Sequence, residues 1–149
     1  GIPCGAALDR RNRRLYVSNR HDSRVLSVNL ETGERAIISG ATEDGATTVG
    51  EGPPLTGPCG ISLTPEEGGL YVANGDLFRI DVVTGDRAPM SVRDTGLGVS
   101  SSTGLGLTGT CGLSLDATAG FAYTCDWMLG RYELATGNRR MLSRGMSPP

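Results

Sequence analysis

The sequence has no lysine, one histidine and one tryptophan, and aromatic residues make up only 5% of its 149 residues. No apolar run approaches the roughly 18 residues that a transmembrane helix needs, so we expect no direct membrane insertion. A Ser-His-Asp or Cys-His triad would have to include His21, which lies in a polar loop beside Asp22 and Ser23. We interpret His21 as a solvated surface group, and the sequence predicts no catalytic residue.

The formal net charge is only −2, with basic and acidic side chains nearly balanced. A nucleic-acid partner is therefore not expected. Glycine is abundant, at 23 residues, and each would cost about 0.5–1 kcal/mol relative to alanine inside a helix. The composition thus argues against an all-helical protein, while the length suits one domain able to bury a core.

The chain contains three copies of one sequence unit. Cys59–Leu63 recurs 52 residues later as Cys111–Leu115, and Thr84–Arg87 recurs at the same offset as Thr136–Arg139. An earlier copy carries the same motifs between Cys4 and Arg35. A repeat of fixed period indicates a repetitive architecture.

Each unit contains four short stretches rich in β-branched and aromatic residues, bounded by Gly, Pro, Asn or Asp. The predicted strands are Gly5–Asp9, Leu15–Asn19, Val25–Leu30 and Arg35–Ser39; Gly60–Thr64, Leu70–Asn74, Leu77–Val83 and Arg87–Val92; and Gly112–Asp116, Phe121–Asp126, Leu129–Leu134 and Arg139–Ser143. In the turn Glu31–Glu34 and its two copies, glycine stands where a three-residue hairpin needs a left-handed residue. No segment shows a helical period, so the predicted class is all-β.

These residues resemble two known repeats. Leu15–Asn19 followed by Val25–Glu34 resembles the YVTN repeat of bacterial surface and exported propellers, and Pro58–Leu63 with Gly69–Asn74 and Phe78–Asp81 is similar to an NHL repeat. The resemblance covers nearly the whole chain and implies a β-propeller of four-stranded antiparallel blades. It implies no single activity, because such propellers include enzymes, binders and scaffolds.

Three blades are expected, at about residues 1–40, 57–93 and 109–144, joined by long loops at 40–58 and 92–110. Because propellers close rings of roughly four to eight blades, residues 1–149 are predicted to form one unit, half of a six-bladed ring. An isolated half ring would expose apolar sheet faces such as that of Val25–Val28. Either another chain, identical or not, completes the ring, or the sequence, which lacks an initiator methionine, is a piece of a longer propeller.

The two long loops have equal length and share glycine, leucine and threonine positions, which predicts ordered shapes. The family resemblance implies that they lie on the face bearing the channel mouth. They would either form a rim that recognises a ligand or partner subunit, or simply pack over the ring face.

The predicted second strands end in Asn19, Asn74 and Asp126, and His21 and Asp22 follow the first of them. Amide and carboxylate oxygens suit calcium, so these three strand-end residues are a candidate calcium site. The resemblance to gluconolactonase-like propellers implies a central metal held by Glu, Asn and Asp, yet no acidic residue here matches that Glu. The alternative is that these side chains only shape the turns.

Four cysteines need an account. Cys4, Cys59 and Cys111 hold equivalent positions at the start of the innermost strands, so we expect them to ring the channel rather than pair with one another. Cys111 and Cys125 can form a disulfide if the register places them opposite each other, whereas a register slipped by one residue places Asp126 opposite Cys111. Buried free thiols are the alternative, and the spacings do not fit paired C-x-x-C zinc sites.

The sequence therefore predicts a non-enzymatic propeller that acts as a scaffold or a protein- or ligand-binding module, completed as a homodimer or within a larger assembly. The alternative is a calcium-dependent hydrolase or lyase of the gluconolactonase or NHL-lyase type, with Asn19, Asn74 and Asp126 as ligands. No cofactor other than calcium is expected. The family resemblance and the proposed disulfide imply an extracytoplasmic location, periplasmic or secreted.

Overall fold

The computed structural model of the chain describes residues 1–66, 68–90, 112–125 and 128–144. Within these ranges the protein is all-β, as predicted, and its strands form three antiparallel sheets. The described part of the chain has no helix with the length and apolar composition that a membrane crossing needs.

In each sheet the strands pair in chain order. The first sheet contains β1 (Pro3–Asp9), β2 (Arg14–Asn19), β3 (Arg24–Asn29), β4 (Arg35–Ala41) and β5 (Thr48–Val49); the second β6 (Ile61–Leu63), β7 (Gly69–Ala73), β8 (Leu77–Asp81) and β9 (Arg87–Pro89); and the third β10 (Gly112–Asp116), β11 (Phe121–Cys125), β12 (Met128–Glu133) and β13 (Arg139–Arg144). The predicted boundaries agree to within about two residues, apart from positions 91–92 and 126, which lie outside the described residues. The short β5 is not predicted from the sequence.

The turn between the third and fourth strands is the same in all three sheets. Gly33, Gly85 and Gly137 have φ angles of 73°, 80° and 71°, which confirms the left-handed residue expected there. The repeat in the sequence is thus a repeat in backbone geometry.

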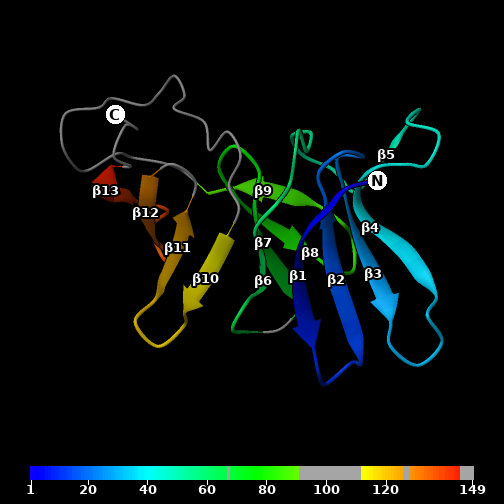
Figure 1. Ribbon diagram of the computed structural model, residues 1–149, viewed down its shortest axis with the longest axis horizontal. Helices are drawn as coiled ribbons and strands as arrows, with labels where there is room; N and C mark the ends of the chain where they lie inside the picture. Colours follow the sequence, from blue (N-terminus) through cyan, green and yellow to red (C-terminus); the bar gives the residue numbers. More distant parts are fainter. Residues whose placement is uncertain (67, 91–111, 126–127, 145–149) are drawn as a thin grey trace, which may run out of the picture.

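The three sheets lie side by side in chain order, and β6 of the second sheet has β1 on one side and β10 on the other (Figure 1). Adjacent innermost strands are the arrangement expected of neighbouring propeller blades. The architecture is therefore propeller-like.

Side chains of neighbouring sheets pack in two separate clusters. One joins the first and second sheets and contains Ala7, Tyr16, Val25, Leu55, Ile61, Leu70, Val72 and Ile80. The other joins the second and third sheets and contains Tyr71, Ala73, Leu77, Ala122 and Tyr132. Every residue of β7 is buried, because successive side chains of a strand point to opposite faces and both faces of this sheet are covered.

Val72 is fully buried, so Val72→Ala should lower the free energy of unfolding by about 2 kcal/mol through lost apolar burial and the cavity left behind. Val83→Ala is the matched control, because Val83 is 87% exposed, and its effect should stay within about 0.5 kcal/mol. Urea unfolding of both variants measures the difference. Equal effects would contradict the packing of β7 between two sheets.

Candidate functional site

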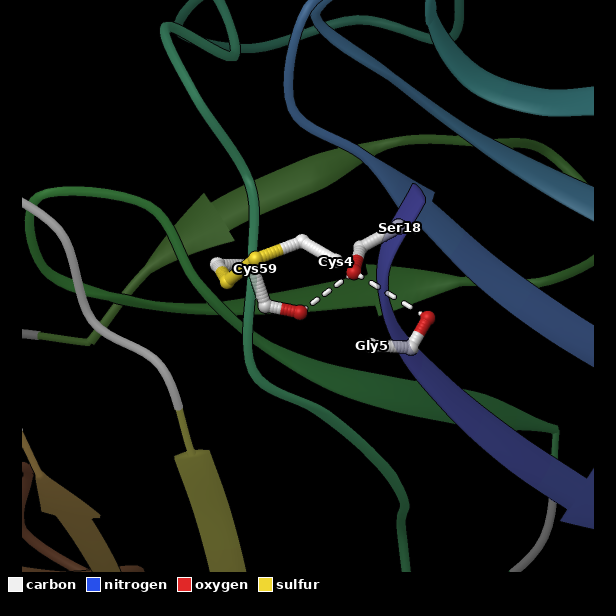
Figure 2. The surroundings of a disulfide bond; sticks show 4 residues. All are labelled: Cys4, Gly5, Ser18 and Cys59. Atoms are coloured by element: carbon white, nitrogen blue, oxygen red, sulfur yellow. Dashed lines mark hydrogen bonds between the residues drawn. A yellow bond between two sulfur atoms is a disulfide. The ribbon is translucent and has the colours of Figure 1, made fainter. Parts of the chain in front are cut away.

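A disulfide joins Cys4 of β1 to Cys59, just before β6, with a Cα–Cα distance of 4.8 Å (Figure 2). The expectation that these two cysteines ring a channel without pairing is therefore wrong. Neighbouring sheets pack with their innermost strands adjacent, so equivalent residues of consecutive units come within bonding distance. In a chain-entropy model, a cross-link across a sequence separation of 55 stabilises the fold by about 4 kcal/mol.

Polar contacts reinforce this close approach. The Ser18 hydroxyl donates to the carbonyl oxygen of Cys59 and lies 3.3 Å from that of Gly5 (Figure 2). A Cβ on Gly5 would lie 2.3 Å from the Cys59 oxygen. Position 5 therefore needs glycine, because any side chain would force the two sheets apart.

The other cysteine prediction is not tested. Cys125 is exposed at the end of β11, where its register partner is Gly112. Cys111 and Asp126 lie outside the described residues. A Cys111–Cys125 disulfide stays a prediction.

The outer edge of the same seam is held by Arg87 of β9. Its side chain is only 5% exposed, and its Nη1 donates to Ser39 Oγ of β4 at 2.9 Å. The guanidinium also donates to four loop carbonyls, those of Val49 (2.7 Å), Gly50 (3.3 Å), Gly52 (3.1 Å) and Pro53 (2.8 Å). Burial lowers the pKa of Arg87, but an arginine remains charged and these oxygens satisfy its donors.

These contacts hold the first long loop, at 40–58, in place. Arg87 holds its middle, Leu55 is buried in the core between the first and second sheets, and the Thr56 N–H donates to Asn74 Oδ1 at 2.7 Å. The loop at 40–58 therefore packs over the seam between these sheets. The loop at 92–110 lies outside the described residues.

Sequence reasoning did not single out Arg87 or Ser39. The signal was present, because the turn motif ends in arginine in every copy, at Arg35, Arg87 and Arg139. What the motif alone does not show is that the arginine reaches back to the preceding sheet.

The structure shows backbone or side-chain partners for two of the candidate calcium ligands, and those of Asn19 shape the turn that follows it. Asn19 Oδ1 accepts from the Asp22 N–H at 3.2 Å, and its Nδ2 donates to Asp22 Oδ2 at 2.8 Å. Asn74 binds the long loop instead. Among the described residues, no three His, Cys, Asp or Glu side chains form a group that could hold a metal ion. Asp126 lies outside these residues, so the calcium site stays a prediction.

The His21 side chain is 69% exposed, as interpreted from the sequence, and its Nδ1 lies 2.8 Å from Asp22 Oδ1. This contact is the main cause of a lowered pKa of the Asp22 carboxyl.

Asp76 lies at the seam between the second and third sheets. Burial raises the pKa of this carboxyl above its usual range, although the Leu77 N–H, at 2.7 Å, and the side chains of Arg139 and Tyr132 oppose the shift. The folded protein therefore holds a proton on Asp76 more tightly than the unfolded chain does.

One face of the first sheet carries apolar residues whose equivalents in the second sheet are buried. The repeat relates Leu15 to Leu70 and Val17 to Val72, and both residues of the second sheet are fully buried in the core that it shares with the first. Their equivalents in the first sheet are only partly buried, and Leu8 is 46% exposed. We call this surface the leading face; its side chains are Leu8, Leu15, Val17, Leu26 and Val28.

The opposite face of the third sheet also exposes apolar residues whose equivalents in the other sheets are buried or packed against a core. Val25 and Leu77 are fully buried, each against the next sheet along the chain, whereas their equivalent Leu129 is 38% exposed. Met90 packs against the core shared with the third sheet, whereas its equivalent Leu142 is 42% exposed. We call this surface the trailing face; the register places Phe121, Tyr123 and Leu129 on it, and the equivalence to Met90 places Leu142 there.

No protein-family model matches the chain, and a search of curated proteins finds no match either. A chain of the crystal structure of a nidogen/laminin complex matches 96% of it with a TM-score of 0.67 and 19% identity, and the match spans 48% of that chain. The extracellular domain of BT4673 from B. thetaiotaomicron matches 95% of it with a TM-score of 0.63 and 17% identity, spanning 17% of that chain. These likenesses support a propeller-like fold. The chain spans about half the length of the first matched chain. Membership of the NHL or YVTN repeat family stays a prediction.

Arg87→Ala should lower the free energy of unfolding by about 3 kcal/mol, because the buried hydrogen-bond partners of the guanidinium are left unsatisfied. Arg87→Lys should recover little, since one ammonium cannot reach the same spread of acceptors. Arg79→Ala is the control: Arg79 is exposed and paired with Glu66 at 3.1 Å, and its loss should cost less than about 1 kcal/mol. Chemical denaturation measures all three, and a small effect at Arg87 would contradict its clamping role.

Asp76→Asn should raise the free energy of unfolding at neutral pH. The raised pKa of Asp76 means that its ionisation destabilises the fold, a loss that begins above the unfolded pKa near 3.8 and is complete above the folded pKa. The gain should shrink as the pH falls towards 3.8. Asp81→Asn should do the opposite, because backbone N–H donors lower the pKa of Asp81. Thermal melts across this pH range decide; parallel curves for wild type and Asp76→Asn would contradict the shift.

Proposed function

We propose that the protein is an extracytoplasmic protein-binding module of β-propeller type, completed by a second copy of its own three-sheet unit. The observation that carries this proposal is the leading face. Four of its five positions, those of Leu15, Val17, Leu26 and Val28, are buried in the second and third sheets, where a neighbouring sheet is present, and only partly buried in the first. A contiguous apolar surface of this kind marks an interaction site.

The partner that fits the leading face best is a further antiparallel sheet. Internal seams of this protein pair a face of the leading pattern with a face of the trailing pattern. The outer surface of the first sheet is of the leading kind and that of the third sheet is of the trailing kind. The matched chain of the nidogen/laminin complex is roughly twice as long as this one, as a ring of two such units would be.

The extracytoplasmic location is supported by two observations. A structural disulfide is typical of oxidising compartments. One structural neighbour is an extracellular domain, and the other belongs to a complex between two proteins. No contact seen in the described residues favours the calcium-dependent hydrolase, so we do not propose it.

Placing a charge on the leading face tests the proposal. The wild-type chain should form a dimer at micromolar concentration in native mass spectrometry, and Val17→Asp should be monomeric, because docking would bury an unpaired carboxylate. Val83→Asp is the matched control: Val83 is 87% exposed and lies off this face, so this variant should dimerise normally. Circular dichroism checks that both variants fold. A strictly monomeric wild type would contradict the proposal.

A further inference from the structure

The turn before β9 grips the preceding sheet. The Ser39 hydroxyl donates to the Gly85 carbonyl oxygen at 2.6 Å, and Ser39 Oγ accepts from Arg87 Nη1 at 2.9 Å. Ser39 is fully buried beneath these contacts. The motif Thr84–Arg87 therefore acts as a clamp on β4, the fourth strand of the neighbouring sheet.

The same motif in the first sheet, Thr32–Arg35, stands open. Arg35 has the same register position in β4 as Arg87 has in β9, because each lies opposite the equivalent residue of the third strand. Arg35 is exposed and lines a hollow of about 350 Å³ with Leu26 of the leading face and with Ile37, the register partner of Leu26. A Cβ on Gly33 would meet no atom within 4 Å, whereas the equivalent position on Gly85 is crowded by the neighbouring sheet.

The serine that such a clamp holds recurs at the other end of the chain. Ser39 lies opposite Val25, next to a bulge between β3 and β4, and Ser143 lies opposite Leu129, next to the equivalent bulge between β12 and β13. Ser39 is buried, whereas Ser143 is exposed beside the trailing face. The chain thus presents one open clamp and one exposed serine, on opposite outer faces.

We propose that the Thr32–Arg35 clamp of one copy closes on β13 of a second copy, head to tail. Arg35 donates to Ser143 Oγ of that copy, and the Gly33 carbonyl accepts from the same hydroxyl, as Arg87 and Gly85 do with Ser39. Two such contacts, related by a two-fold axis, close the ring. This inference rests on the proposed function and adds the polar contact and the register between the two copies.

A double-mutant cycle on the dimer tests the clamp. The dissociation constants of wild type, Arg35→Ala, Ser143→Ala and the double variant are measured by analytical ultracentrifugation of the whole chain. Each single substitution should weaken the dimer about tenfold or more, since a charge-assisted hydrogen bond is lost. The double variant should be little weaker than either single, because both remove one shared contact. Arg13→Ala, an exposed arginine paired with Glu31, should leave the constant unchanged.

The outcomes separate the two proposals. A wild type that dimerises while Arg35→Ala binds as tightly, or while the two single effects multiply in the double variant, overturns the clamp and leaves the docking of the apolar faces intact. A wild type that stays monomeric overturns both. Both residues are exposed in the single chain, so the variants should fold, and circular dichroism spectra that match wild type exclude a folding defect.

Discussion

A β-sheet with apolar side chains on both faces is stable in water only when both faces are covered, and the second sheet is where the chain achieves this. Leu70 and Val72 face the first sheet, while Tyr71 and Ala73 belong to the core shared with the third. Burial of these alternating side chains fixes the order and spacing of the three sheets. The loops, glycines and polar contacts described above serve that packing.

The seam between the first and second sheets is closed at both edges by different chemistry. The Cys4–Cys59 disulfide fastens the innermost strands, and Arg87 fastens β9 to Ser39 of β4 and to the long loop. A guanidinium suits the outer edge, because the loop offers carbonyl oxygens that a single rigid fork of donors satisfies together. The apolar core between these edges excludes water, which makes an unsatisfied donor at Arg87 costly.

The repeat made the strands predictable, because each copy confirmed the boundaries of the others and the turn glycines marked the same left-handed position. The disulfide was not predictable in the same way. Equivalence of Cys4 and Cys59 in sequence suggests equal distances from an axis, whereas their pairing depends on how closely two strands approach, which Gly5 permits. The roles of Asn19 and Asn74 also depend on which loop N–H groups fold back onto them, and strand-end chemistry alone fits a metal equally well.

The head-to-tail order of the sheets decides what kind of assembly the open faces would build. Each internal seam joins a trailing face to a leading face, so an external seam of the same design is heterologous: it joins different surfaces of its two partners. Such contacts form open filaments unless the rotation per sheet closes the ring. If two copies suffice for closure, forming the first seam places the second pair of faces at a high effective concentration. Dimerisation would then be cooperative between the seams, and damage to the Arg35 clamp would weaken both of them at once.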